Sequence, residues 1–202
     1  MDEHLIAAAR AVKRRRRLAF PTLWLFTDSK RLPDPLPAIA ALPRGISGVV
    51  FRHDGAAGRA DLGRRIAALC RVRGIALVVA GTRAGDWRLA AALHAGVHLR
   101  GGAMPRTRYR GPIVTASAHG RADLIAAARA GVDLVFLSPA FVTASHPGAA
   151  PLGAVRWAGL ARRSKIPVLA LGGLDGRKQR RLGVFCAGTG AIGALSCREK
   201  IV

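Results

Sequence analysis

Ile-Pro-Val-Leu-Ala-Leu-Gly-Gly-Leu-Asp-Gly, residues 166–176, is the stretch that decides the fold. Within it, residues 168–171 are a short, wholly apolar run that a proline precedes and two glycines follow. Such a run predicts a strand buried on both faces, as in a parallel sheet covered by helices. Gly172 and Gly173 lack a Cβ, so backbone N–H groups at this turn can approach a ligand oxygen, and a following helix would direct its positive end to the same place. The stretch therefore predicts a phosphate-binding site, with a plain Gly-Gly turn as the alternative.

Similar short apolar runs recur along the chain and alternate with helical stretches. The predicted strands occupy residues 23–28, 48–54, 75–80, 96–100, 112–117, 133–138, 168–171 and, weakened by two glycines, 188–195. The predicted helices occupy residues 3–17, 59–73, 86–95, 121–130 and 152–163, with a short one before Pro43. This alternation indicates βαβ units and a parallel sheet, and eight strands close most naturally into a barrel.

We therefore predict an α/β protein, a compact single (β/α)8 or TIM barrel that forms one domain over residues 1–202. Residues 1–20 are expected to hold an extra, basic N-terminal helix and residues 21–196 the barrel. After Ser196 too little chain remains for a normal eighth helix, so the C-terminal helix is predicted to be truncated. The N-terminal helix is expected to cover that gap or to mediate a homodimer. No Gly-x-Gly-x-x-Gly follows the first strand, which disfavours a dinucleotide-binding sheet.

Composition narrows the class of protein. Half of the 202 residues are hydrophobic, which excludes a mainly disordered chain, yet no apolar run is long enough to span a membrane. The N-terminus lacks the pattern of a secretory signal, so we expect a cytoplasmic protein without a membrane partner. The three cysteines are widely spaced and support neither a disulfide framework nor a zinc knuckle.

The charge balance is extreme, with 33 lysines and arginines against 11 acidic residues and a net charge of +22. Such a field concentrates anions, whether phosphorylated metabolites or nucleic acid. Only residues 13–17, Lys-Arg-Arg-Arg-Arg, form a dense cluster, and aromatics are just 5% of the chain, few for stacking bases. Nucleic acid is therefore a disfavoured partner, and much of the charge is expected to lie on solvated helix faces.

The active site of a barrel of this kind is built at the carboxyl ends of its strands. The residues predicted there are rich in cations and hydroxyls and poor in carboxylates. This set suits a phosphorylated substrate, whereas a divalent metal would want several oxygen ligands.

Six motifs at these strands carry a resemblance to a known family. They are Leu-Phe-Thr-Asp at 25–28, Val-Val-Phe-Arg at 49–52, Gly-Val-His-Leu at 96–99, Ser-Ala-His at 117–119, Ala-Gly-Val-Asp-Leu-Val-Phe-Leu-Ser-Pro at 130–139 and Ile-Pro-Val-Leu-Ala-Leu-Gly-Gly-Leu at 166–174. In this order and spacing the chain resembles the thiamin phosphate synthase/TenI group of TIM barrels from about residue 23 to 195. The resemblance implies thiamin biosynthesis and a thiazole phosphate or thiamin phosphate ligand.

Departures from the synthase pattern bear on the mechanism. The synthase joins a pyrimidine pyrophosphate to a thiazole phosphate with the help of Mg²⁺, and its motifs Arg-Glu-Lys and Asn-Asp-Arg fall here on residues 52–54, Arg-His-Asp, and 81–83, Gly-Thr-Arg. The second aspartate is missing from residues 100–103, Arg-Gly-Gly-Ala, and the lysine of the Thr-x-Thr-Lys loop is replaced by His146. We therefore expect no metal ligands and no cofactor, with Mg²⁺ needed only if the chain is a synthase.

The resemblance to TenI-type thiazole tautomerases fits these departures, because they too lack the metal ligands and place a histidine after strand five. His119 falls on that position, and histidine suits proton transfer because its ordinary pKa of about 6.5 is close to working pH. His98, inside a strand, is expected to be a satisfied barrel residue. The resemblance implies catalytic roles for His119, Ser117 and Arg52; phosphate binding by Gly172, Gly173, Ile192 and Gly193; and substrate binding by His53, Arg83, Arg100, Thr143 and His146.

Three functions stay open: a TenI-like metal-independent tautomerase or degenerate synthase that binds a thiazole phosphate, a divergent thiamin phosphate synthase, and a non-catalytic binder of a phosphate ligand or RNA.

Overall fold

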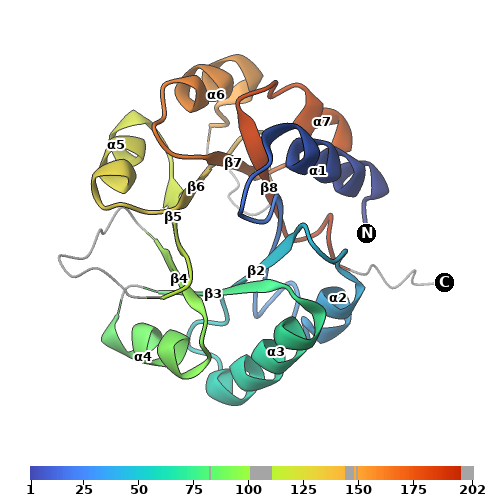
Figure 1. Ribbon diagram of the computed structural model, residues 1–202, viewed down its shortest axis with the longest axis vertical. Helices are drawn as coiled ribbons and strands as arrows, with labels where there is room; N and C mark the ends of the chain where they lie inside the picture. The colour runs from blue at the N-terminus through green and yellow to red at the C-terminus, as the bar shows by residue number, and fades with distance from the viewer. Residues whose placement is uncertain (82, 101–110, 144–147, 149, 197–202) are drawn as a thin grey trace.

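The computed structural model describes residues 1–81, 83–100, 111–143, 148 and 150–196. Eight parallel strands pair in sequence order and β8 returns to β1, which closes the barrel that Figure 1 shows along its axis. The strands are β1 (Leu23–Phe26), β2 (Ser47–Phe51), β3 (Ala76–Ala80), β4 (Gly96–Leu99), β5 (Val114–Ala118), β6 (Leu134–Leu137), β7 (Val168–Leu171) and β8 (Cys186–Ala191). The predicted (β/α)8 fold is confirmed.

Seven helices surround the barrel in the part of the chain that the structure describes. They are α1 (Glu3–Arg16), α2 (Leu36–Ala41), α3 (Arg59–Arg73), α4 (Ala84–Ala92), α5 (Arg121–Arg129), α6 (Gly153–Arg162) and α7 (Gly176–Arg180). Each of α2 to α7 follows a strand and packs on the outside of the sheet, as a parallel strand with a crossover helix requires. None of the described helices combines the length and apolar character needed to cross a bilayer.

Helix α1 takes the place that an eighth helix would fill. It packs against α7 and β8 and buries Leu5, Ile6, Ala9 and Val12 (Figure 1). The Asp2 carboxylate caps the helix by accepting a hydrogen bond from the Leu5 N–H, as an N-cap residue does. The prediction that the N-terminal helix covers this gap is confirmed. The predicted truncated C-terminal helix falls largely on residues 197–202, outside the described residues.

The eighth strand was predicted too late in the chain. It runs over Cys186–Ala191 instead of residues 188–195, and residues 192–196 form a turn. Its glycines have a packing reason: a Cβ on Gly190 would lie 2.7 Å from the Phe26 ring. A residue with a side chain at position 190 would therefore displace the Phe26 ring from the barrel interior. This explains a glycine in the strand although glycine has a low strand propensity.

The interior of the barrel is filled by crossed rings. Phe136 meets Trp24, Phe26 and His98 edge-on, with centroids 5.7, 4.8 and 5.6 Å apart respectively. Such edge-to-face arrangements are the favoured geometry of aromatic pairs. The barrel is thus solid below its mouth, and a ligand has room only above this layer.

Candidate active site

A cavity of about 420 Å³ lies at the carboxyl ends of the strands. Residues after β1, β2, β5, β6, β7 and β8 reach it, and it has the size of a small-molecule site. Its lining residues are Arg31, Arg52, His119, Ser138, Pro139, Thr143, Leu171, Gly172, Gly173, Leu174, Gly190, Ala191, Ile192, Gly193 and Ala194. Seven of the residues predicted for the site therefore share one cavity: Arg52, His119, Thr143, Gly172, Gly173, Ile192 and Gly193.

The glycine turn after β7 is fixed by its neighbours. Gly172 and Gly173 have φ angles of 93° and 64°, values that residues with a side chain rarely adopt. A Cβ on Gly173 would also collide with the carbonyl oxygen of Val142 in the loop after β6. Within the described residues the backbone N–H groups of Gly173, Gly193 and Ala194 donate no hydrogen bond, so they are available to the oxygens of an anion.

The helix that follows this turn contributes less than expected. Helix α7 spans only five residues, and its first N–H groups already have acceptors. Asp175 accepts from the Lys178 N–H at 2.8 Å, and the Asp2 carboxylate accepts from the Gly176 N–H at 3.3 Å. Two carboxylates thus accept from N–H groups at the positive end of α7, so we assign these N–H groups no part in phosphate binding.

His119 is held with one ring nitrogen engaged. Its Nδ1 lies 2.9 Å from the Ser138 carbonyl oxygen, which can only accept, so Nδ1 carries the proton. The backbone N–H of His119 donates to the Asp123 carboxylate at 2.7 Å, which fixes the start of the loop. Nε2 has no partner among the described residues and is the nitrogen that a ligand can use.

Two arginines give the cavity its charge. Arg52, after β2, lies with its guanidinium 6.0 Å from the Phe26 ring centre, and its Nε is buried without a hydrogen bond to any described residue. Burial first, and then the positive charge of Arg100, lower the pKa of Arg52. A buried guanidinium with an unused donor is favourably placed to bind an anion.

Sequence reasoning missed Arg31. The Asp28 carboxylate accepts from the Lys30 and Arg31 N–H groups and pairs with the Arg31 guanidinium at 3.0 Å. Partial burial acts to raise the pKa of Asp28, but the Arg31 side chain and these N–H groups outweigh it and lower the pKa to about 2. Asp28 thus stays ionised and holds the turn that brings Arg31 to the cavity. An Asp three residues before an Arg was the available signal.

Ser117 and His98 form a hydrogen-bonded chain inside the barrel, below the mouth. The two ring nitrogens of His98 lie 2.8 Å from the Thr115 hydroxyl and 3.0 Å from the Ser117 hydroxyl. Burial, followed by the charges of Arg52 and Arg100, lowers the pKa of His98 to about 3, so it stays neutral. His98 is thus the satisfied barrel residue that was expected, whereas Ser117 does not line the cavity, and we leave it out of the catalytic proposal.

His53 lies on the far side of the strand from Arg52. It is 2% exposed and stacks on Phe51, outside the barrel. Its Nε2 lies 3.3 Å from the Pro33 carbonyl oxygen and its Nδ1 lies 3.0 Å from the Thr27 hydroxyl, which in turn accepts from the Arg52 N–H. Both ring nitrogens of His53 are engaged by partners within the protein, so we propose that His53 positions Arg52 and does not bind substrate.

The other predicted substrate-binding residues lie around the mouth or outside the described residues. Arg100 pairs with Asp54 at 2.7 Å, and Arg83 is an exposed residue at the start of α4. Neither lines the cavity. His146 falls outside the described residues.

The fold and this site define a class: a (β/α)8 barrel with a cationic, glycine-lined pocket at its mouth. The thiamine monophosphate synthase (TMP-TENI) family model matches residues 24–192, and the chain belongs to this family. Its site thus lies where the family's barrels are expected to act.

Known proteins agree at the level of family and fold. A stretch of 81 residues is 38% identical to the "Putative thiamine-phosphate synthase 2" of Aquifex aeolicus, over 40% of this chain and 41% of that relative. The structure of a thiamine phosphate pyrophosphorylase from Pyrococcus furiosus superimposes with a TM-score of 0.74 at 24% identity, over 88% of both chains. FabK from Thermotoga maritima shares the fold more distantly, with a TM-score of 0.66 at 18% identity over 92% of this chain and 61% of that one.

The Mg²⁺ that the synthase reaction uses does not fit the described donors. Among the described residues the cavity lining holds no carboxylate, and the aspartates near the mouth, Asp28, Asp54 and Asp86, all pair with arginines. No group of three potential metal ligands occurs in the described part of the chain. Of the residues outside the described part of the chain, 82, 101–110, 144–147 and 149 include no acidic residue by sequence, and residues 197–202 include one, Glu199. A hard cation prefers several free carboxylate oxygens, so we derive no step through a metal.

Proposed function

We propose that this chain is a metal-independent enzyme that acts on a thiazole phosphate, a tautomerase of the TenI kind, with His119 as its acid and base. The observation that carries the proposal is the geometry of His119: Nδ1–H is engaged by the Ser138 carbonyl and Nε2 is left for the ligand. A fixed tautomer with one free nitrogen in a cavity without carboxylates suits proton transfer.

The proposed reaction moves one proton and needs no other reactant. Nε2 takes the proton from a carbon of the non-aromatic ring, and the electron pair of that C–H bond enters the ring system. The Ser138 carbonyl stabilises the imidazolium through Nδ1–H. The same proton then returns from Nε2 to a second position, and the ring becomes aromatic with its atoms and charge unchanged.

The rest of the cavity is assigned to binding. We place the phosphate at the N–H groups of Gly173, Gly193 and Ala194, which belong to the turns after β7 and β8, line the cavity and donate to no other described residue. Arg31 and Arg52 line the same cavity from the segments after β1 and β2 and would hold a second anionic group. Thr143 lies beside the glycine turn as a further polar contact.

A synthase remains the second candidate, favoured by the names of its relatives. The deciding assay mixes pyrimidine pyrophosphate with aromatic thiazole phosphate, with Mg²⁺ or with a chelator, and detects thiamin phosphate as its fluorescent oxidation product. Turnover that requires Mg²⁺ would overturn the tautomerase proposal.

The direct test follows conversion of the unrearranged thiazole tautomer by ultraviolet absorbance. The His119→Gln variant should lose roughly a hundredfold or more in rate while it still binds the aromatic product. His94→Asn is the matched control, because His94 is exposed on another loop and its φ of 51° suits asparagine. Binding without turnover in the unmodified chain would point to a non-catalytic binder.

A further inference from the structure

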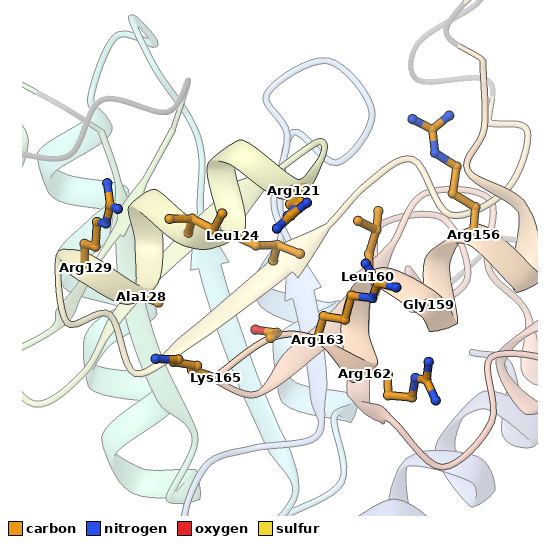
Figure 2. A pocket seen from close by; sticks show the side chains of 12 residues that line it. Arg121, Leu124, Ala128, Arg129, Arg156, Gly159, Leu160, Arg162, Arg163 and Lys165 are labelled. Atoms are coloured by element: carbon orange, nitrogen blue, oxygen red, sulfur yellow. The ribbon is translucent and has the colours of Figure 1, made fainter.

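A second and larger hollow, of about 610 Å³, lies between α5 and α6 (Figure 2). It shares no residue with the mouth cavity. Its lining residues are Arg121, Leu124, Ile125, Ala128, Arg129, Arg156, Gly159, Leu160, Arg162, Arg163, Ser164 and Lys165. We call it the α5/α6 groove.

The floor of the groove is apolar. Leu124, Ile125 and Ala128 come from α5, and Leu160 faces them from α6 (Figure 2). Ile125 is 41% exposed, although it is a large apolar side chain. A Cβ built on Gly159 would meet no atom within 4 Å, so the missing side chain leaves part of the floor open. Such a floor gains free energy when an apolar side chain covers it.

The rim of the groove is cationic throughout. Arg121 and Arg129 stand on α5, and Arg156, Arg162, Arg163 and Lys165 stand on α6 or just after it (Figure 2). All six are exposed, and none forms an ion pair with another described residue. The neighbouring carboxylates of Asp123 and Asp133 accept from the N–H groups of His119 and Val114.

Six cations around an apolar floor select an occupant that is acidic at its edges and apolar at its centre. Arginine pairs strongly and in a bidentate manner with carboxylates. Among the described residues the lining holds no aromatic side chain, so bases have nothing to stack on and RNA is the weaker fit. A second copy of this chain, with a net charge of +22, would be repelled.

We propose that the α5/α6 groove docks an acidic amphipathic helix of a partner protein. Helices α5 and α6 hold nine and ten residues, so the groove is about 14 Å long and accommodates two to three helical turns. Apolar residues on one face of the guest helix cover Leu124, Ile125 and Leu160. Its glutamates and aspartates pair with the arginines on either side. This surface is independent of the proposed function.

The test uses a fluorescein-labelled synthetic helix of about 15 residues, with leucines at positions i, i+3, i+4 and i+7 and glutamates at most others. Fluorescence anisotropy is measured with the full chain at about 0.15 M salt, where long-range attraction is screened. The unmodified chain should bind the peptide, and Gly159→Leu should weaken binding about tenfold or more by filling the floor.

Matched variants separate the two contributions. Arg129→Glu with Arg163→Glu should weaken binding at least as much. Arg65→Glu with Arg71→Glu, the same charge change at two exposed arginines of α3, should leave it unchanged. Gly159→Ala is the milder filling variant. It should fold at least as stably as the unmodified chain, because a helical glycine costs about 1 kcal/mol relative to alanine.

Three outcomes would overturn the proposal. One is equal affinity for a peptide of the same composition whose leucines are scattered, since charge alone would then account for binding. Another is undiminished binding by the Gly159→Leu chain. The third is tighter binding of a single-stranded oligouridine that Arg129→Glu with Arg163→Glu abolishes, which would assign the groove to RNA.

Discussion

His98 is expected to make the stability of the barrel depend on pH below neutrality. It is 1% exposed, and its pKa is about 3 in the folded chain, lowered chiefly by burial from its ordinary value of 6.5. Between these two pKa values, His98 is protonated in the unfolded chain and neutral in the folded chain. The contribution of neutral His98 is therefore fully present above pH 6.5 and is lost as the pH falls towards 3.

The size of the effect follows from the two pKa values. A pH of 4.5 lies two units below the pKa of His98 in the unfolded chain, and each unit corresponds to about 1.4 kcal/mol of unfolding free energy. The folded barrel should therefore lose about 3 kcal/mol of unfolding free energy to this one side chain between pH 7.5 and pH 4.5. For a protein of ordinary stability that is a large fraction of the total.

The measurement compares the unmodified chain with His98→Gln by urea unfolding at pH 7.5 and pH 4.5. Glutamine can still bond to Thr115 and Ser117 but does not titrate. All other titrating groups are common to both proteins, so they cancel in the difference of differences. The variant should lose about 3 kcal/mol less than the unmodified chain on acidification. An equal loss in both would refute the claim that His98 is held neutral.

Two further changes test the mouth and the closure of the barrel. Gly173→Ala should weaken the affinity for a phosphate ligand about tenfold or more, as measured by calorimetry. The new Cβ would collide with the Val142 carbonyl, and the φ of 64° is unfavourable for alanine. Unchanged affinity would show that this turn does not bind the phosphate. Deletion of residues 1–17 should lower the unfolding free energy by about 5 kcal/mol or more, because Leu5, Ile6 and Val12 lose their burial, and a stably folded truncated barrel in a urea titration would contradict the role given to α1.

Local signals were enough for much of the fold. Strand β7 was predicted to the residue, because a proline and two glycines bound a wholly apolar run. Helix α3, predicted over about residues 59–73, spans Arg59–Arg73 and lies between Gly58 and Gly74, which both adopt left-handed backbone angles. Strand β8 was misplaced because its glycines are required by distant neighbours: Gly190 packs on the Phe26 ring and Gly188 on the Thr22 backbone, and no local pattern contains these contacts.

Site residues were harder to predict because successive strand residues face opposite sides of the sheet. Arg52 faces the interior near Phe26, so its neighbour His53 faces outward against Phe51. Ser117 and His119 share the inner face, yet Ser117 lies one step deeper and bonds to His98. The sequence predicted which residues lie near the end of a strand. It did not predict which side of the sheet each side chain faces or how deep in the barrel it lies, because both depend on the register of the closed sheet.

The position of α1 has a consequence for how the chain is made. This helix is synthesised before all eight strands of the barrel, yet its docking surface on β8 and α7 is made only after the first seven strands. Its apolar face stays uncovered until then, so the barrel can complete its closure only after translation of β8. A circular permutant with residues 1–17 joined behind the C-terminus would turn that distant docking into a neighbouring one, and chains with more local contacts fold faster.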